Sequence, residues 1–176
     1  MTFTETKLSG GFTIDLQRLE DDRGYFARVF DHQAFAEHGL ETHVSQCNLS
    51  FNHRRGTVRG LHFQAAPHEE VKIVRCTRGA IFDVMVDLRP SSPTFRDWVG
   101  VELTADNYRL LYVPRGFAHG YQTLVDDTEV FYQVSAPYSP GSERGIPWND
   151  PALGIDWPLE ATVVSKKDRG WRQLEA

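Results

Sequence analysis

Short apolar segments alternate with polar turns along the middle of the chain. Five segments are rich in β-branched and aromatic residues, at 71–76, 80–88, 97–103, 109–114 and 128–135. Such residues favour β-strands over helices. The intervening turns carry Gly, Pro, Asp and Asn, as in "TRG" and "RPSSP". Short strands at this regular spacing predict an antiparallel sandwich or barrel.

Helical pattern is confined to the edges of this region. Residues 32–40 predict one short helix, which Asp31 can cap and which Gly39 can end. The segment 138–151 is rich in Pro and Gly and predicts a long loop. We therefore expect an all-β fold with a few short peripheral helices.

The chain shows no internal repeat, low-complexity segment or obvious linker. We therefore expect a single domain over residues 1–176. After the predicted loop, the motif "GIDWP" should return Ile155 and Trp157 to the body of that domain.

Composition and charge narrow the classes of function. The 176 residues are 40% hydrophobic and include 19 basic and 24 acidic side chains, a net charge of −5. The arginines form no basic stripe, so we expect no nucleic-acid partner, and no apolar run is long enough to span a membrane. The N-terminus lacks the apolar core of a signal peptide, and Cys47 and Cys76 match no metal or disulfide pattern. We expect a cytoplasmic protein that holds a small ligand through a local cluster of residues.

Two motifs resemble those through which cupin-type jelly-roll barrels bind a metal, G-x5-H-x-H-x3–4-E-x6-G and P-x-G-x2-H. Here His62 and His119 fit, but Gln64 takes the second histidine position and Lys72 the glutamate position. A lysine ammonium would repel a divalent ion, which needs electron-pair donors. We expect no metal. A metal site stays an alternative only through other donors in the intervening loop, His68, Glu69 and Glu70.

The same positions supply acid–base groups instead. His62 can act as a base near neutral pH, Lys72 can stabilise an oxyanion, and Tyr132 can donate a proton if it faces the barrel interior. Taken singly, Tyr132 reads as a core aromatic, Lys72 as a solvated strand residue and Asp168 as a surface residue. Their combination favours catalysis.

Several motifs occur in an order typical of one family. They are "RGLHFQ" (59–64), "VPRGFAHGYQTL" (113–124), "EVFYQV" (129–134), "WNDP" (148–151) and "SKKD" (165–168). The chain resembles, over nearly its whole length, the dTDP-4-dehydrorhamnose 3,5-epimerases, which are non-metal cupins acting on nucleotide-linked 4-keto-6-deoxy sugars.

The resemblance implies epimerisation at C3 and/or C5 through an enolate, with no cofactor. The favoured reaction converts dTDP-4-dehydro-6-deoxyglucose to dTDP-4-dehydrorhamnose. His62 would be the base, oriented by Asp168. Lys72 would stabilise the enolate oxygen, and Tyr132 would return a proton to the opposite face.

The resemblance also implies a set of substrate-binding positions: Arg23, Phe26, Gln46, Asn48, Arg59, His119 and Tyr138. Arg59 and Arg23 would grip the diphosphate, because a guanidinium suits phosphate oxygens. Gly60 would let the strand approach that diphosphate. Family members are dimers that exchange N-terminal strands, so we expect a homodimer whose site is completed by the partner chain.

Three residues depart from the family pattern and leave specificity open. Arg28 stands where an acidic residue is common, Cys47 replaces an aspartate, and Glu70 replaces a glutamine. The alternatives that remain are a single-centre epimerase on another nucleotide sugar, a metal-dependent cupin, and a sugar-binding cupin without turnover.

Overall fold

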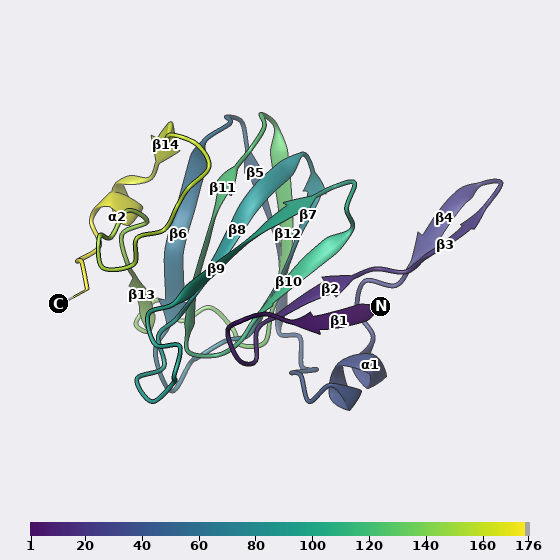
Figure 1. Ribbon diagram of the computed structural model, residues 1–176, viewed down its shortest axis with the longest axis horizontal. Coiled ribbons are helices and arrows are strands. Elements are labelled where there is room, and N and C mark those ends of the chain that lie inside the picture. Colours follow the sequence, from purple (N-terminus) through teal and green to yellow (C-terminus); the bar gives the residue numbers. More distant parts are fainter. Residues whose placement is uncertain (175–176) are drawn as a thin grey trace.

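Two antiparallel sheets pack face to face in the computed structural model, which describes residues 1–174 (Figure 1). The first sheet runs in the order β1 (Thr2–Glu5), β2 (Phe12–Asp15), β10 (Arg109–Val113), β7 (Lys72–Arg78), β12 (Thr128–Val134) and β5 (Gln46–Asn52). The second runs β13 (Glu143–Gly145), β6 (Thr57–Gln64), β11 (Phe117–Thr123), β8 (Ala80–Asp87) and β9 (Trp98–Thr104). A short strand, β14 (Val163–Val164), pairs in parallel with β6. The result is a cupin-type jelly roll, as predicted.

The five predicted strands are confirmed as β7, β8, β9, β10 and β12, with ends that differ by one or two residues. The predicted loop over 138–151 is wrong in part, because β13 forms inside it and pairs with β6. Strand β11 is buried at all seven positions, yet its sequence "FAHGYQT" is half polar. Burial on both faces removes the alternation of apolar and polar residues by which a strand is recognised.

Two short helices lie at the edges of the sandwich. Helix α1 (His32–Glu37) begins as predicted at Asp31, whose carboxylate accepts a hydrogen bond from the amide of Ala34 at 3.1 Å. Helix α2 (Lys166–Arg169) was not predicted; the Ser165 hydroxyl accepts from the amide of Asp168 at 3.0 Å and caps it. Within residues 1–174, no helix is long and apolar enough to cross a membrane.

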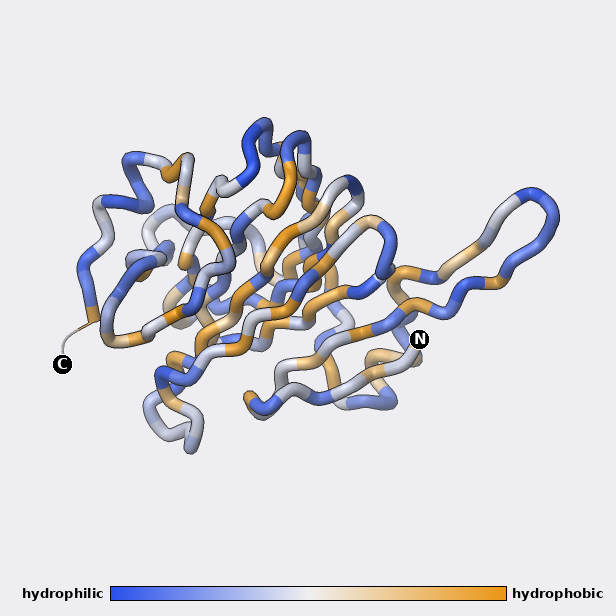
Figure 2. The backbone as a smooth tube through the Cα atoms, turned by 45° about the horizontal axis from the view of Figure 1, so that its top comes forward, coloured by the Kyte–Doolittle hydropathy of each residue, from blue (hydrophilic) through white to orange (hydrophobic). Residues whose placement is uncertain are grey.

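Three apolar clusters hold the layers together within residues 1–174. Hydrophobic positions recur along the strands of the sandwich, interrupted by hydrophilic ones (Figure 2). The largest cluster lies between the sheets and includes Val74, Met85 and Leu111, all without exposed surface. Phe35 of α1 fixes that helix to the outer face of the first sheet. The outer face of the second sheet is covered by the segment that includes Ile155 and Trp157, which confirms their predicted return to the body.

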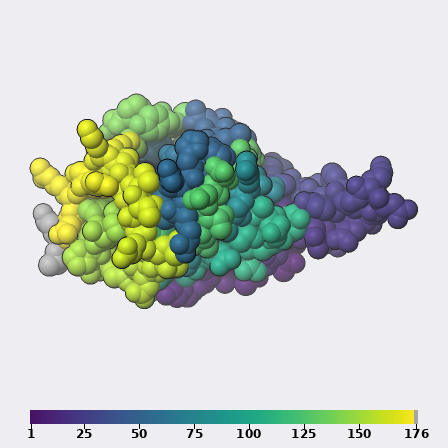
Figure 3. Space-filling model, turned by 90° about the horizontal axis from the view of Figure 1, so that it is seen from above, coloured from purple at the N-terminus to yellow at the C-terminus, as the bar shows by residue number. Residues whose placement is uncertain are grey.

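A two-stranded hairpin, β3 (Arg18–Asp21) with β4 (Gly24–Ala27), projects from this body (Figures 1 and 3). Its apolar side chains have little cover within the chain: Leu19 is 60% exposed and Phe26 is 59% exposed. Exposed apolar residues gathered on one projecting element mark a surface suited to a partner.

A β-bulge in β6 places Arg59 and His62, the first and last residues of the "RGLH" motif, on the inner face. Arg59 pairs with Tyr121 and His62 pairs with His119, so three steps along β6 match two steps along β11. Without the extra residue, side chains three positions apart would face opposite sides of the sheet. The bulge explains how an arginine and a histidine at this spacing reach the same cavity.

Gly60, within that bulge, is required by the neighbouring strand. Its φ is +123°, and a Cβ there would lie 2.6 Å from the Cα of Gly120 on β11. The close approach at Gly60 within this chain is therefore to the backbone of β11. The expectation that Gly60 also makes room for the diphosphate stays a prediction.

Replacing Gly60 by Ala should lower the free energy of unfolding by roughly 2 to 4 kcal/mol, through backbone strain and overpacking. Urea unfolding followed by tryptophan fluorescence measures this difference. Gly141→Ala is the matched control, because a Cβ there meets nothing within 4 Å. Equal stability of the two variants would contradict the packing role of Gly60.

Candidate active site

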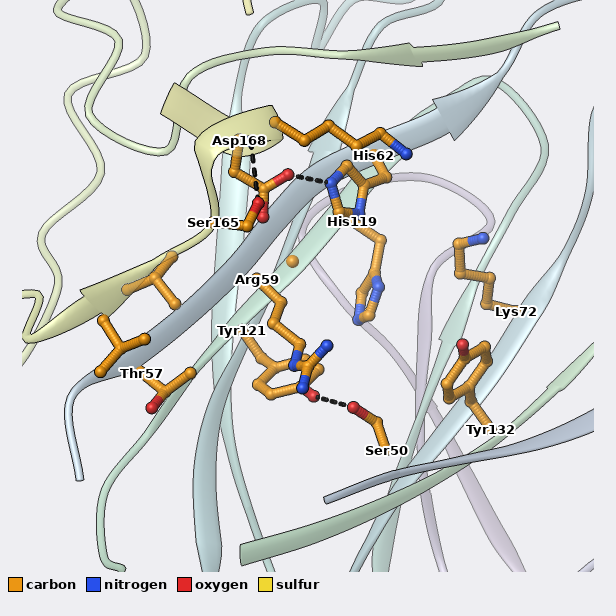
Figure 4. Close-up of a pocket in the computed structure, with 14 residues that line it drawn as sticks. Ser50, Thr57, Arg59, His62, Lys72, His119, Tyr121, Tyr132, Ser165 and Asp168 are labelled. Atoms are coloured by element: carbon orange, nitrogen blue, oxygen red, sulfur yellow. Dashed lines mark hydrogen bonds and ion pairs between the residues drawn. The ribbon is translucent and has the colours of Figure 1, made fainter. Parts of the chain in front are cut away.

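A cavity of about 450 Å³ opens between the two sheets and gathers all of the predicted catalytic residues (Figure 4). His62 and His119 reach it from β6 and β11, and Lys72 and Tyr132 reach it from β7 and β12 of the facing sheet. Asp168 enters from α2. The four residues predicted to be catalytic, His62, Lys72, Tyr132 and Asp168, therefore line a single cavity.

His62 and Asp168 form a closely bonded pair. Nε2 of His62 lies 2.5 Å from Oδ1 of Asp168, whose side chain is almost fully buried. Burial opposes ionisation of Asp168, but the hydrogen bond and charge of His62, with smaller contributions from the Gly60 amide and Ser165, together lower the pKa of the carboxyl group. An ionised carboxylate only accepts hydrogen bonds, so Nε2 carries the proton and Nδ1 is left as the basic atom.

Lys72 and Tyr132 form the opposite wall. In the pairing of β12 with β7, Val134 lies opposite Lys72 and Tyr132 lies opposite Val74, so the two side chains are diagonal neighbours on the inner face. Burial lowers the pKa of the Lys72 ammonium to about 8, against a smaller opposing effect of Glu143. Lys72 is therefore not the solvated strand residue that it resembles when taken singly, and Tyr132 faces the cavity.

A second histidine–aspartate pair lies deeper in the cavity and includes a residue that the sequence interpretation missed. Nε2 of His119 lies 2.8 Å from Oδ1 of Asp83, which has no exposed surface. Burial raises the pKa of Asp83, and its contact with His119 opposes that shift. The available signal was an aspartate in the middle of the apolar strand "AIFDVMVDL", since a buried carboxylate needs a partner.

Arg59 lies at the rim of the cavity. Its Nε donates to Oδ1 of Asn52 at 2.7 Å, and one terminal nitrogen donates to the carbonyl of Phe51 at 3.3 Å. These bonds hold the guanidinium in place and leave further N–H groups for an anionic ligand.

A second cavity, of about 370 Å³, shares His62, Lys72 and Tyr132 with the first. Gln46, Asn48 and Tyr138, three of the predicted substrate-binding residues, line this second cavity. The shared residues form the boundary between the two spaces. A ligand with two chemically different parts could therefore occupy both.

Glu143 and Lys167 belong to this region and were also missed. Oε1 of Glu143 accepts from Nζ of Lys167 at 2.5 Å, and Oε2 accepts from the hydroxyl of Tyr138 at 2.8 Å. Glu143 lies in β13, the strand that replaced part of the predicted loop. Because that strand was not foreseen, the position of its carboxylate could not be foreseen either.

Arg23 and Phe26 do not reach either cavity within this chain. Both lie in the projecting hairpin, where Arg23 is 89% exposed in its side chain and pairs with Asp21. The structure of the single chain therefore brings together five of the seven predicted substrate-binding residues and leaves these two apart.

The alternative metal-ligand set is not assembled. Among residues 1–174, no group of three or more His, Cys, Asp or Glu side chains is close enough to hold a metal ion. Gln64, at one of the motif's ligand positions, is engaged by the amide of Ser139 and the carbonyls of His68 and Pro137.

Comparison with known proteins decides the family. The family model for dTDP-4-dehydrorhamnose 3,5-epimerase matches residues 5–176. The chain belongs to this family. It is therefore an enzyme of the isomerase class, as its relatives' names state.

Individual relatives are similar over nearly the whole chain. A dTDP-4-dehydrorhamnose 3,5-epimerase of Sinorhizobium fredii is 50% identical over 169 residues, covering 96% of this chain and 84% of that protein. The crystal structure of the Bacillus anthracis enzyme with TDP and pyrophosphate bound matches with a TM-score of 0.95 and 41% identity, covering 98% of this chain and 99% of that one. The Legionella pneumophila enzyme, in complex with dTDP-4-keto-L-rhamnose, matches with a TM-score of 0.92 and 36% identity, covering 98% and 92%.

Proposed function

We propose that this enzyme converts dTDP-4-dehydro-6-deoxyglucose to dTDP-4-dehydrorhamnose by inverting C3 and C5. One observation carries the proposal: a histidine base oriented by a buried carboxylate faces a lysine and a tyrosine across one cavity. The names of relatives and the bound dTDP-4-keto-L-rhamnose of the Legionella enzyme support this choice of substrate.

The first step is removal of a proton from a carbon beside the C4 ketone. Nδ1 of His62 takes the proton, while Asp168 holds the ring and stabilises the imidazolium that forms. The electron pair left on carbon moves onto the ketone oxygen and gives an enolate. Lys72, protonated, donates to that oxygen, and desolvation strengthens its interaction with the new charge.

The second step returns a proton from the other side of the sugar ring. Tyr132 belongs to the sheet opposite His62, so its hydroxyl can approach the face that the base does not. Protonation there inverts the centre. His119, held by Asp83, lines the same cavity and is placed to bond the ketone oxygen or a neighbouring hydroxyl.

The remaining residues fit a diphosphate and a nucleoside. Arg59 at the rim offers guanidinium N–H groups to phosphate oxygens. Tyr138, Gln46 and Asn48 line the second cavity, where a flat base could stack on the phenol ring and bond the amides. In the proposed complex the sugar binds between the sheets and the nucleoside binds beside β13.

Product analysis tests the proposed reaction. The purified enzyme is incubated with dTDP-4-dehydro-6-deoxyglucose, and proton couplings around the ring are measured by NMR. Couplings of the rhamno configuration support inversion at both centres. Inversion at one centre would replace the proposal by a single-centre epimerase, and an unchanged sugar would contradict turnover of this substrate.

We also propose that the chain acts as one domain in a cytoplasmic homodimer, in which the β3–β4 hairpin enters the partner's site. The exposed Leu19 and Phe26 would be covered there, and Arg23 would reach a bound diphosphate. The free thiols of Cys47 and Cys76 are in keeping with a reducing compartment.

Replacing Leu19 and Phe26 together by Ser should convert the dimer to a monomer and cut kcat/KM about tenfold or more, because each site loses its hairpin. Sedimentation velocity and steady-state kinetics measure the two effects. Val125→Ser is the control, since Val125 is an exposed apolar residue outside the hairpin. A wild-type protein that sediments as a monomer would contradict the proposed dimer.

A further inference from the structure

Glu70 lies beside the catalytic lysine. It comes two residues before Lys72, which begins β7, and residues two apart in extended chain face the same side. Nζ of Lys72 donates to Oε1 of Glu70 in an ion pair, and the two side chains are 13% and 11% exposed. Such a pair lies largely out of water, where the attraction between the charges is stronger than at the surface.

Glu70 is itself held in place. Its other carboxylate oxygen, Oε2, accepts from Nε2 of Gln64 at 3.4 Å. Gln64 is fixed in turn, because its Oε1 accepts from the amide of Ser139 at 2.6 Å. The carboxylate therefore has a defined position in the wall of the second cavity rather than that of a mobile surface side chain.

The groups that surround the Lys72 ammonium have opposing effects on its charge. Burial favours the neutral amine, and Glu143 of β13 favours the ammonium. The other titratable or charged groups that line the two cavities bordered by Lys72 are Arg59 and His62 of β6, His119 and Tyr121 of β11, Tyr132 of β12, Tyr138, and Lys167 and Asp168 of α2. None of these groups forms an ion pair with Lys72 among residues 1–174. Glu70 is the residue that does.

We propose that Glu70 is a positioning residue that holds the Lys72 side chain in its cationic form and aims it at the substrate ketone. The proposal rests on the proposed function for the role of Lys72, but the ion pair can be tested without substrate. Its consequence is that the charge available to stabilise the enolate persists to higher pH than burial alone would allow.

The test compares Glu70→Gln with wild type by trace labelling with acetic anhydride across pH. Only a neutral amine is acylated, so the pH dependence of Lys72 labelling, followed by peptide mass spectrometry, gives its pKa. An opposite charge in contact shifts a pKa by at least about one unit, so the Lys72 midpoint should fall by about that much in Glu70→Gln. The alkaline limb of kcat/KM should move with it, giving a loss of roughly fivefold or more at pH 8.5 and a smaller loss at pH 6.5.

Two further variants make the result specific. Glu69→Gln removes the adjacent carboxylate, which lines neither cavity, and should leave both the midpoint and the pH profile unchanged. Glu70→Asp keeps the charge on a shorter side chain, so its Lys72 midpoint should lie between those of Glu70→Gln and the wild type. An unchanged Lys72 midpoint in Glu70→Gln would overturn the inference. A shifted midpoint in a protein that turns over no nucleotide sugar would support the ion pair and refute the proposed function.

Discussion

Replacing His62 by Asn is expected to abolish exchange of the sugar's C3 and C5 protons with solvent, with a loss of at least about 10³-fold in rate. The asparagine amide can still donate to Asp168, whose carboxylate therefore keeps a hydrogen-bond partner in the buried site. What is lost is the basic nitrogen. Proton NMR of dTDP-4-dehydro-6-deoxyglucose in D2O measures the exchange rate directly.

The control for this variant is His68→Asn, which changes an exposed histidine in the loop before β7. It should exchange both protons at the wild-type rate. Circular dichroism and dTDP binding should be unchanged in His62→Asn, because the ring is not part of the core. If His62→Asn still exchanged either proton at a rate near wild type, another residue would be the base.

Replacing Tyr132 by Phe should separate the two halves of the reaction. Without the phenol, net inversion should fall by about 10²-fold or more, while removal of the proton by His62 should fall by less than about tenfold. The reason is that Tyr132 and His62 lie on facing sheets and so act on opposite faces of the sugar. The ratio of solvent deuterium incorporated to product formed measures this separation.

Tyr112→Phe is the matched control for the tyrosine variant. Its hydroxyl accepts from the amide of Glu41 at 3.0 Å and packs outside the two cavities, so its loss should lower stability slightly and leave the ratio unchanged. If exchange and inversion fell in parallel in Tyr132→Phe, the assignment of Tyr132 as the acid on the opposite face would be wrong.

The central strands of the fold could be predicted because their residues carry the signal locally. Strand β8, for example, is a run of apolar and β-branched residues between turns, and only its end differs from the prediction. The N-terminal strands and β11 gave weaker signals. Segments such as "RLED" of β3 are exposed along their length, and no apolar pattern marks them as strands.

The four catalytic candidates could be named from the sequence, but the geometry that brings them together could not. The spacing of His62 and Arg59 did not show that a bulge at Gly60 turns both inward, because bulges depend on how two strands pair. Asp168 is separated from His62 by 106 residues, and the resemblance to a family, not the local pattern, linked them. Asp83 lies in a predicted strand, but its partner His119 lies in β11, which gave a weak signal, and Glu143 lies in β13, which was not predicted.

The role of Glu70 also depends on contacts that a local sequence pattern does not reveal. Glu70 departs from the family pattern, but whether its carboxylate faces the site could not be decided from the sequence alone. Its contact with Lys72 depends on the extended chain before β7 and on the anchoring of Gln64. A charge change at one position is therefore interpretable only together with the burial of its neighbours.

Proton NMR of dTDP-4-dehydro-6-deoxyglucose with the wild-type enzyme in D2O and a metal chelator tests the proposed mechanism most directly. We expect both the C3 and the C5 proton signals to disappear, because one base serves both positions beside the ketone and uses no metal. Loss of one signal would keep the mechanism and restrict it to a single centre. If neither proton exchanged, the assignment of the His62–Asp168 pair as a base for this sugar would be contradicted.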